Sequence, residues 1–386
     1  MAKRVKLNQF CEKVATIATS YNGTIDYIDI SAVDNKSKSI TSTQTINSIE
    51  APSRAKQLIK NGDVLVSTVR PNLNAVAYVD LETSNLLVAS TGYCVLRFTE
   101  DLDARYAFYF CQSPYFIDDM VAQATGASYP AVSTSIVKSS MIPLYVKKQQ
   151  QRIAAVLDKV SELIDLRKRQ LAKLDELVKS RFIELFGDPL LDDGRYPKVP
   201  LGTLAEVGSS KRIFEKEYVS EGVPFYRTKE IVELSKGNRI TTELFITRDR
   251  YDEIRDEYGV PQKGDLLISA VGTIGVIWIV DGKNDFYFKD GNLLRVAATE
   301  RFAPTYIKHL LEALIGAYKQ EMSSGTAYAA LTISALKDML VYEVPITEQE
   351  QFAAFVEQTD KSKLTVQQSL DKLETLKKSL MQEYFG

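Results

Sequence analysis

The chain has 386 residues, of which 45% are hydrophobic and 25% are charged, and its formal net charge is −2. This composition excludes a disordered or fibrous chain and provides enough apolar residues for two hydrophobic cores. The balance of charges also excludes the strong basic surplus that an independent nucleic-acid-binding domain usually carries.

The cysteines and the apolar stretches indicate in which cellular compartment we expect the protein. Cys11, Cys94 and Cys111 have no C-x-x-C spacing, so the sequence predicts neither a disulfide framework nor a metal site. The basic start "MAKRVKLNQF" has no apolar run behind it, which argues against a signal peptide. The longest apolar stretch, "LLISAVGTIGVIWIV", is too short to span a membrane and indicates two buried strands around a turn. We therefore expect a cytoplasmic protein.

The first predicted globular segment covers residues 1–148. Strand patterns at 62–69 ("GDVLVSTV") and 74–80 ("NAVAYVD") flank the polar stretch "RPNLN", and a helix is expected over about 104–124. Short alternating strands combined with one or two helices predict a compact α+β domain.

A long helix is predicted over 149–187. This stretch contains no proline and no glycine before Gly187, and Pro189 follows, which is typical of a helix C-terminus. Apolar residues recur at alternating steps of four and three, interrupted once by Arg167, and this heptad pattern is typical of helices that pair. The apolar seam positions are Ile153, Leu157, Val160, Ile164, Leu171, Leu174 and Val178.

The second predicted globular segment covers 188–347 and contains a flexible joint near its start, at 190–195 ("LLDDGR"). It repeats the order of the first, with strands in 264–271 ("GDLLISAV") and 276–281 ("VIWIVD") and a helix over about 304–323. A second long helix is predicted over 348–386. Its seam includes the polar positions Thr359, Lys363 and Lys377, and its apolar positions are Phe352, Val356, Val366, Leu370, Leu373 and Leu380.

The two halves of the chain are copies of one unit. When 150–187 is laid over 349–386, an offset of 199 residues, 12 of 38 positions are identical. The same offset aligns "TGASYPAVSTSIVK" (125–138) with "SGTAYAALTISALK" (324–337), and an offset of 202 aligns "GDVLVSTV" with "GDLLISAV". The sequence is therefore a tandem duplication of a unit about the size of one domain plus a helix.

The duplication predicts how the helices are arranged. Two helices of similar length with matching seams are expected to pair with each other, and a duplicated unit that closes around a pseudo-two-fold axis makes them antiparallel. We expect an α+β fold with two similar globular domains separated by a pair of long antiparallel helices, an intramolecular coiled coil. The alternative is that each helix packs on its own domain as one more core element.

The sequence contains no recognisable catalytic constellation. His309 lies in an apolar helical stretch, and "GTIG" (272–275) lacks the Lys-Ser/Thr of a phosphate-binding loop. The stretch "SPYF" (113–116) lacks the second proline of the signature of amino-group DNA methyltransferases. Asp63 and Asp265 occupy equivalent "GD" turns, where the pair more often begins a strand than binds a metal ion. We expect no enzymatic activity.

Polar clusters beside the predicted strands and turns are the candidate binding residues. Arginine and asparagine can pair with base edges and lysine with phosphates, although a solvated surface role is the commoner one for any single residue. In the first segment the candidates are Arg54, Lys56, Arg70, Asn72 and Asn74. In the second they are Lys211, Arg212, Arg227, Lys229, Lys236, Asn238 and Arg239. The clusters fall in matching regions but differ in sequence, as expected of two readers of different targets.

The combination of these motifs resembles the specificity subunit of type I restriction-modification systems over nearly the whole chain. The resemblance rests on "APSRAKQLIKNGDVLVSTVRPNLN", "EGVPFYRTKEI", "GDLLISAVGTIG", "TGASYPAVS" and the helix opening "QQQRIAAVLDKVSELIDLRKRQLAKLDELVKSRFIELFG". The joints "IPLYVKKQQQ" and "VPITEQEQ" depart from the proline-rich joint that family members often have.

The resemblance implies a non-catalytic DNA-recognition subunit. Residues 1–148 and 188–347 would be two target-recognition domains that read a bipartite double-stranded DNA target, and 149–187 and 348–386 would be spacer helices that dock two methyltransferase subunits. Restriction-translocase subunits would be further partners, and S-adenosylmethionine and ATP would bind the partner subunits. Two rival interpretations stay open at this stage, namely a coiled-coil scaffold whose domains bind proteins and a hydrolase of unfamiliar design.

Overall fold

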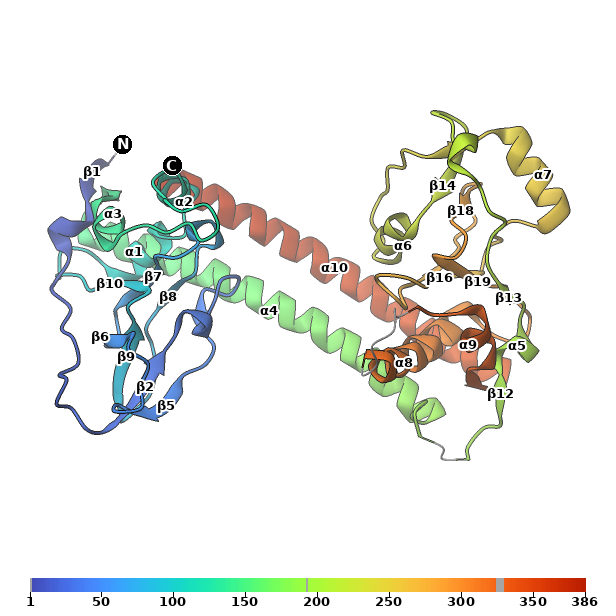
Figure 1. Cartoon of the computed structure of the whole chain (residues 1–386), viewed down its shortest axis with the longest axis horizontal. Helices are drawn as coiled ribbons and strands as arrows, with labels where there is room; N and C mark the ends of the chain where they lie inside the picture. Colours follow the sequence, from blue (N-terminus) through green and yellow to red (C-terminus); the bar gives the residue numbers. More distant parts are fainter. Residues whose placement is uncertain (1, 192–193, 324–329) are drawn as a thin grey trace. The chain divides into compact units, whose positions relative to one another are not determined.

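The computed structural model describes residues 2–191, 194–323 and 330–386 and divides into two compact units. Unit 1 comprises Met1–Arg169 and Val366–Gly386, and unit 2 comprises Gln170–Thr365. Each unit therefore contains one globular domain and one half of each long helix (Figure 1). Residues 192–193 of the predicted joint and 324–329 of the duplicated "SGTAYAALTISALK" lie outside the described residues. The four-segment division at 148, 187 and 347 stays a prediction.

The domain of unit 1 is built from short strands in several small sheets. One sheet has the order β5 (Gln44–Asn47), β2 (Thr24–Ile28), β9 (Leu86–Ser90) and β6 (Ala55–Leu58), with β2 and β9 parallel. A second has the antiparallel order β10 (Tyr93–Leu96), β7 (Val64–Ser67) and β8 (Val76–Tyr78). The pairs β1 (Lys3–Lys6) with β11 (Met141–Leu144) and β3 (Val33–Asp34) with β4 (Ser39–Ile40) complete it. The expected strands at 62–69 and 74–80 are β7 and β8.

Three short helices cover this domain. They are α1 (Ala104–Phe110), α2 (Pro114–Ala122) and α3 (Thr134–Ser139). The prediction of a single helix over 104–124 is wrong, because the helix is interrupted between α1 and α2. Pro114 has no amide hydrogen to continue a helix and begins α2 instead, while the Ser113 hydroxyl accepts a hydrogen bond from the Phe116 amide as its N-cap.

The domain of unit 2 repeats this plan. Its main sheet has the order β13 (Val207–Gly208), β19 (Leu293–Val296), β16 (Leu266–Ser269) and β17 (Ile277–Ile279). The second sheet has the order β15 (Phe245–Ile246), β14 (Val223–Tyr226) and β18 (Tyr287–Phe288), and β12 (Lys198–Pro200) pairs with β20 (Leu340–Tyr342). The helices are α5 (Leu201–Leu204), α6 (Thr228–Ser235), α7 (Arg248–Tyr258), α8 (Pro304–Ser323) and α9 (Ile333–Asp338). The helix expected over 304–323 is confirmed.

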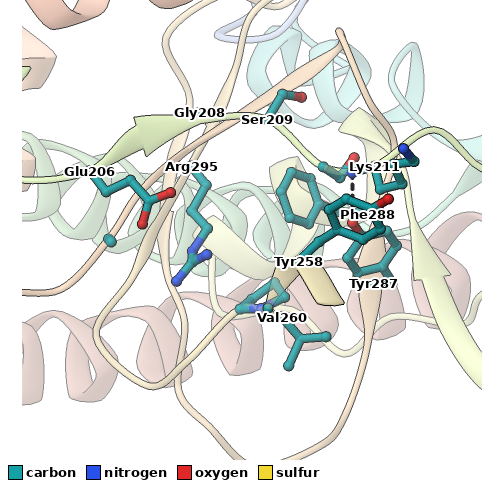
Figure 2. Close-up of a pocket in the computed structure, with 13 residues that line it drawn as sticks. Glu206, Gly208, Ser209, Lys211, Tyr258, Val260, Tyr287, Phe288 and Arg295 are labelled. Atoms are coloured by element: carbon teal, nitrogen blue, oxygen red, sulfur yellow. Dashed lines mark hydrogen bonds between the residues drawn. The ribbon is translucent and has the colours of Figure 1, made fainter. Parts of the chain in front are cut away.

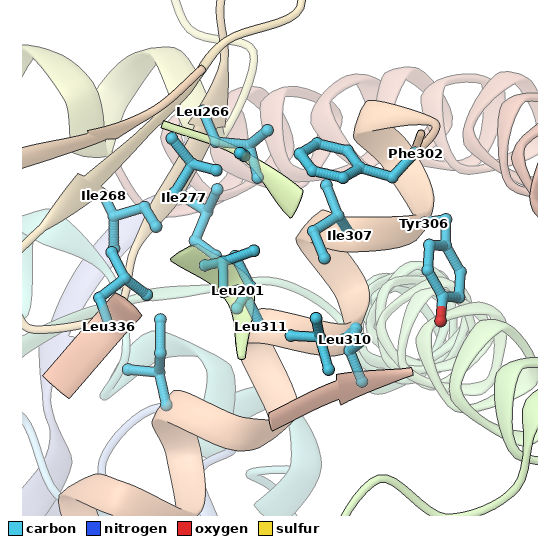
Figure 3. Close-up of a cluster of buried hydrophobic side chains, with 14 of the residues drawn as sticks. Leu201, Leu266, Ile268, Ile277, Phe302, Tyr306, Ile307, Leu310, Leu311 and Leu336 are labelled. Carbon is cyan, nitrogen blue, oxygen red and sulfur yellow. The ribbon is translucent and has the colours of Figure 1, made fainter. Parts of the chain in front are cut away.

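The core of unit 2 lies between its main sheet and α8. Figure 3 shows side chains of β16 and β17 facing those of α8, among them Leu266, Ile277, Ile307 and Leu311. All four are less than 2% exposed, so each contributes roughly 1.5–3 kcal/mol of hydrophobic stabilisation. The alternating apolar residues of the strand thus provide one face of the core and the helix stripe provides the other.

Two long helices run through the units, α4 (Lys147–Phe186) and α10 (Ile346–Phe385). Every apolar seam position named above is buried or half-buried, whereas Leu177 and Leu376, which lie off the seam, are 47% and 45% exposed. In unit 1 Lys168 Nζ lies 3.0 Å from Glu374 Oε1, and in unit 2 Lys363 Nζ lies 2.7 Å from Asp175 Oδ1. The helices therefore pair with each other in both units.

The helix pair is antiparallel. In unit 1 the start of α4, at Ile153 and Leu157, shares a cluster with Phe385 at the end of α10. In unit 2 the end of α4, at Phe186, shares a cluster with Phe352 near the start of α10. These clusters also contain the domain cores. Both predicted arrangements are therefore present: the ends of the helices pack on the domains, and their middle parts pair with each other.

The repeated ending "FG" anchors each helix C-terminus to a domain. The fully buried Phe186 lies 4.9 Å from Tyr306 between ring centroids, and the fully buried Phe385 lies 5.2 Å from Tyr106. Tyr106 and Tyr306 are equivalent in the duplication, and each donates its hydroxyl hydrogen to a backbone carbonyl, of Pro143 and of Tyr342. The C-terminal helix thus closes the core of unit 1, as α4 closes the core of unit 2.

A buried glutamine fixes the start of each long helix. Gln150 and Gln349 are each 1% exposed and identical in the two copies. The Gln150 amide donates to the Asp101 and Tyr145 carbonyls and accepts from the Asp103 amide. Gln349 makes the same three bonds in unit 2, to Arg301, Val344 and Ala303. All polar atoms of both side chains are thereby satisfied, as burial requires.

Candidate nucleic-acid interface

In each domain, a framework of backbone hydrogen bonds holds together the loops that carry predicted binding residues. We call this region the rim; it includes Arg54 and Arg70 in unit 1 and Lys211 and Arg212 in unit 2. In unit 1 the Thr68 amide donates to the Gly92 carbonyl, and the Val132 amide donates to the Thr68 carbonyl, both at 2.9 Å. In unit 2 the corresponding bonds join Ala270 to Asn292 and Leu331 to Ala270, also at 2.9 Å. The loops on the two rims are therefore held by the same backbone geometry and differ in their side chains.

The rim of unit 1 brings several predicted residues together. The Arg54 carbonyl accepts from the Thr91 amide at 2.9 Å, next to Gly92 in the framework, and the Arg70 amide donates to the Pro130 carbonyl at 2.7 Å. Arg54, Lys56, Arg70 and Asn72 are all exposed, and no ion pair between described residues involves the three cations. This rim thus carries positive charge that is free to contact an anionic ligand.

Arg70 is held in a strained position. Its backbone φ of 50° is left-handed, which is uncommon for a residue with a side chain. Its guanidinium lies 4.8 Å from the ring centroid of Tyr129, which is 69% exposed. The turn before Tyr129 requires Gly126, whose φ is +103° and where a Cβ would meet the Tyr129 carbonyl oxygen at 2.9 Å. Such strain concentrates at functional positions.

Tyr129 is a candidate that the sequence reasoning did not single out. It lies with Arg70 on the wall of a cavity of about 640 Å³ that Asp34 and Asn35 also line. Its repetition in both copies was the available signal, but its counterpart in the second copy lies outside the described residues.

Asn74 does not belong to the exposed rim. It is 7% exposed, and its amide donates to the Cys111 carbonyl at 2.8 Å. Its side-chain oxygen accepts from Lys38 Nζ at 2.9 Å. Because both ends of the amide bond groups of the domain, Asn74 is not available to a base edge in this arrangement, and we assign it a supporting part instead.

The rim of unit 2 surrounds a cavity of about 270 Å³. Figure 2 shows Lys211 beside Tyr258 and Tyr287, with Glu206 and Arg295 at the other end of the cavity. The Lys211 amide donates to the Tyr287 hydroxyl at 2.7 Å, and its ammonium lies 4.4 Å from the Tyr258 ring centroid. Ser210 Oγ, buried at this rim, has no hydrogen-bond partner among the described residues and can bond a ligand.

Most other candidates of unit 2 are paired with carboxylates. Arg212 Nε lies 2.8 Å from Asp290, Arg227 Nη2 lies 3.2 Å from Glu230, and Lys236 Nζ lies 2.7 Å from Glu233. Lys229 lies between Glu230 and Glu243 at 3.6 and 3.9 Å, and the Asn238 amide donates to Glu233 at 2.7 Å. Arg239 is exposed and has no ion pair among the described residues.

The two rims therefore differ in electrostatics. The candidate cations of unit 1 are free of carboxylates, whereas those of unit 2, Lys211 and Arg239 excepted, must exchange an acidic partner to contact a phosphate. Carboxylates at such positions also accept hydrogen bonds from the amino group of cytosine. The pattern permits different base preferences on the two rims.

The residues that could suggest catalysis have packing roles. His309, on α8, lies edge-on to Phe352 with centroids 5.4 Å apart, and its Nδ1 lies 3.3 Å from Glu312. Burial raises the pKa of the Cys94 thiol to about 12, which makes it a poor nucleophile. In the described ranges no group of three metal-ligating side chains occurs, and no helix is long and apolar enough to cross a membrane.

Asp63 and Asp265 begin strands, as expected, and each forms a buried ion pair. Asp63 Oδ2 lies 2.7 Å from Arg97 Nη2, and Asp265 Oδ2 lies 2.6 Å from Arg295 Nε. Asp63 also accepts from the Lys60 amide, and Asp265 from the Gln262 amide. Their part is to join the turn to the neighbouring strand.

Comparison with known proteins places this architecture in context. The family model "Type I restriction modification DNA specificity domain" matches twice, over residues 3–176 and 195–375. A putative type I restriction enzyme specificity subunit of Haemophilus influenzae is 25% identical over 292 residues, which cover 74% of this chain and 68% of that protein. A type I restriction enzyme specificity subunit of Methanocaldococcus jannaschii is 25% identical over 209 residues, 49% of this chain and 46% of the relative.

Two solved structures share the fold. A chain from a study of complex assembly and conformational transition of the type I R-M system matches with a TM-score of 0.64 and 23% identity, covering 99% of this chain and 97% of that one. The S subunit of a type I restriction-modification system from M. genitalium matches with a TM-score of 0.57 and 16% identity, covering 99% and 96%.

Proposed function

The chain belongs to the family of type I restriction modification DNA specificity domains, with two such domains in tandem, and we propose that each domain reads one half of a bipartite DNA target. Specificity subunits of type I systems are non-catalytic recognition subunits. The alternative of a protein-binding scaffold is not favoured, because the matched family is defined by DNA specificity.

One observation carries the proposal of a split target. The same hydrogen-bonded framework holds both rims, yet Arg70 of the first rim corresponds to Gly272 of the second at the offset of 202. A retained framework with different side chains is what two readers of different half-sites require. Direct readout needs side chains at base edges, and phosphate contacts fix the register.

The partners complete the activity. We propose that two methyltransferase subunits, and restriction-translocase subunits where the system has them, assemble on this chain. S-adenosylmethionine and ATP then bind those partners. The near-zero net charge fits this division, because partner subunits that enclose the duplex supply part of the electrostatic attraction. A protein that reads genomic DNA acts in the cytoplasm of a bacterial or archaeal cell, and we propose that localisation.

The experiment is to express the chain with its methyltransferase partner and map methylated motifs across a host genome. We expect one bipartite motif for the native chain. Substitution of Arg70 or Asn72 by alanine should relax one half-site, and substitution of Lys211 or Arg239 should relax the other, each by about 1–3 kcal/mol where the residue makes a bidentate base contact.

The matched control is Lys361→Ala, which removes an exposed cation that is paired with Glu357 on α10, an element that contains none of the candidate base-contacting residues. It should leave the motif unchanged. If the Arg70 and Lys211 variants relaxed the same half-site, the assignment of one half-site to each domain would be refuted.

A further inference from the structure

A cationic cavity in unit 1 lies beside the long helices and is separate from the rim. It measures about 320 Å³ and is lined by Lys36, Lys38, Arg105 and Lys377, together with hydroxyl groups such as Ser39 and Ser161. The only carboxylate among its lining residues is Asp80. The cations come from the β3–β4 turn, α1 and α10, which are distant in sequence, so the fold gathers the charge.

Two hydrogen bonds to Asn74 fix the position of the Lys38 ammonium group. This group donates to the Asn74 backbone carbonyl at 2.5 Å and to the Asn74 side-chain oxygen at 2.9 Å. Both residues have left-handed backbones, with φ of 58° and 47°, and only Arg70 shares this conformation among the described residues other than glycine. An ammonium has three donors, and these two bonds leave one for a ligand.

Lys377 replaces an apolar residue of the seam. At the offset of 199 its counterpart is Val178, which is 3% exposed in unit 2. No ion pair between described residues includes Lys377, and its ammonium lies 5.7 Å from the Tyr109 ring centroid. A half-buried lysine without a carboxylate partner costs stability unless something else neutralises it.

Two cations of this cavity, Lys38 and Lys377, have no carboxylate partner among the described residues. Burial, and then the charge of Lys377, lowers the pKa of Lys38 to about 8. Burial, and then Lys168, lowers the pKa of Lys377, against the opposite influence of Asp158 and Glu374. Arg105 is paired with Asp158, and Asp34, near Lys38, is occupied by the amides of Lys36 and Ser37.

We propose that this cavity is a phosphate-binding site in which Lys38 and Lys377 hold the anion. Two ammonium groups and neighbouring hydroxyls suit a tetrahedral oxyanion, and the seam position of unit 2 that carries Val178 lacks the second cation. The phosphate group belongs either to the DNA backbone or to a free phosphate compound. The proposal concerns the cavity itself and does not depend on the reading of DNA.

The test uses the full chain and inorganic phosphate, with chloride replaced at constant ionic strength. We expect phosphate to raise the melting temperature of the native chain. Lys38→Gln and Lys377→Gln should weaken phosphate binding by roughly tenfold or more, because each removes a charge-assisted hydrogen bond. Lys378→Gln removes the same charge from the next, exposed position of α10 and should keep the full response.

A second readout separates binding from folding. Phosphate raises the pKa of the lysines it contacts, so binding near pH 8 should take up protons, which calorimetry in two buffers of different ionisation enthalpy measures. Lys377→Met, which restores an apolar seam residue, should fold stably and lose both the thermal response and the proton uptake. An equal phosphate response in the native chain, Lys38→Gln and Lys377→Met, or none in the native chain, would overturn the proposal.

The salt dependence of DNA binding identifies the source of the phosphate. If the DNA backbone occupies the cavity, Lys377→Gln should reduce the slope of log affinity against log salt by about 0.9, and inorganic phosphate should compete with DNA. If a free phosphate compound occupies it, the slope should stay unchanged while the response to inorganic phosphate is lost. A native chain that failed to bind DNA would count against the proposed function and leave the phosphate result to decide this site.

Discussion

At the scale of single residues, an ion pair to a buried aspartate occurs at equivalent positions in the two domains, Asp63 with Arg97 and Asp265 with Arg295. Asp265 has a 2% exposed side chain, and Arg295 Nε lies 2.6 Å from it. Removing one partner of such a pair leaves an uncompensated buried charge. We therefore expect Arg295→Ala to reduce the free energy of unfolding by about 3–5 kcal/mol.

Unfolding of unit 2 can be followed by the fluorescence of Trp278, because the chain has one tryptophan. Trp278 lies on β17, which pairs with β16, the strand that follows Asp265. Arg255→Ala is the control in the same unit, since the Arg255 side chain is 48% exposed and its ion pairs lie on the surface. Its cost in urea unfolding should stay within about 0.5 kcal/mol. Equal costs for the two variants would show that the buried pair has no special part.

Sequence reasoning identified residue types better than residue roles. Asn72 and Asn74 were equivalent candidates, yet Asn72 is exposed and Asn74 is buried against the Cys111 carbonyl, a partner 37 residues away. The pairing of Arg212 with Asp290 spans 78 residues and is equally invisible in a local pattern. By contrast, Gln150 and Gln349 could have been predicted as structural, because a polar identity retained between diverged copies indicates a shared buried contact.

At the scale of elements, the heptad pattern predicted which faces of the long helices are buried. Leu174 lies on the seam of α4 and is half-buried, whereas Leu177, three residues later, is 47% exposed. The position of the break between α1 and α2 was available from Pro114 but was missed, because the apolar residues on both sides continue a helical pattern.

The seam predicts the outcome of a charge substitution. Leu174→Asp should destabilise unit 2 by roughly 2–3 kcal/mol, because it places a carboxylate among apolar side chains. The pKa of this introduced carboxyl would be raised by burial, so the loss of stability should be present at neutral pH and diminish as the pH falls through that raised pKa. Leu177→Asp is the matched control and should change stability by less than about 0.5 kcal/mol. Urea unfolding followed through Trp278 decides between them.

At the scale of the whole chain, the duplication links the two domains through continuous helices. Each long helix has 40 residues, so it is about 60 Å long, and each begins in one unit and ends in the other. The end of the C-terminal helix is part of the core of unit 1, because Phe385 is fully buried there and Arg4 Nη2 donates to its carbonyl at 2.9 Å. The seam and the repeated ending made this exchange of helices predictable, whereas the charges on the two rims depend on tertiary pairing.

The helices should therefore determine the gap between the two half-sites. One heptad inserted after Leu174 lengthens α4 by roughly 10 Å, about three base pairs at 3.4 Å each. It turns the helix by ~20°, whereas three base pairs turn the duplex by roughly 100°. Insertion into α4 alone also breaks its register with α10, so we expect methylation to be abolished.

A second heptad after Lys363, which contacts Asp175 on the facing helix, restores the register and provides the control. That double variant should fold but lose the native motif, because length is matched while phase is not. Mapping of methylated motifs with partner subunits present tests this, and an unchanged motif with an unchanged gap in the double variant would show that the helices do not set the spacing.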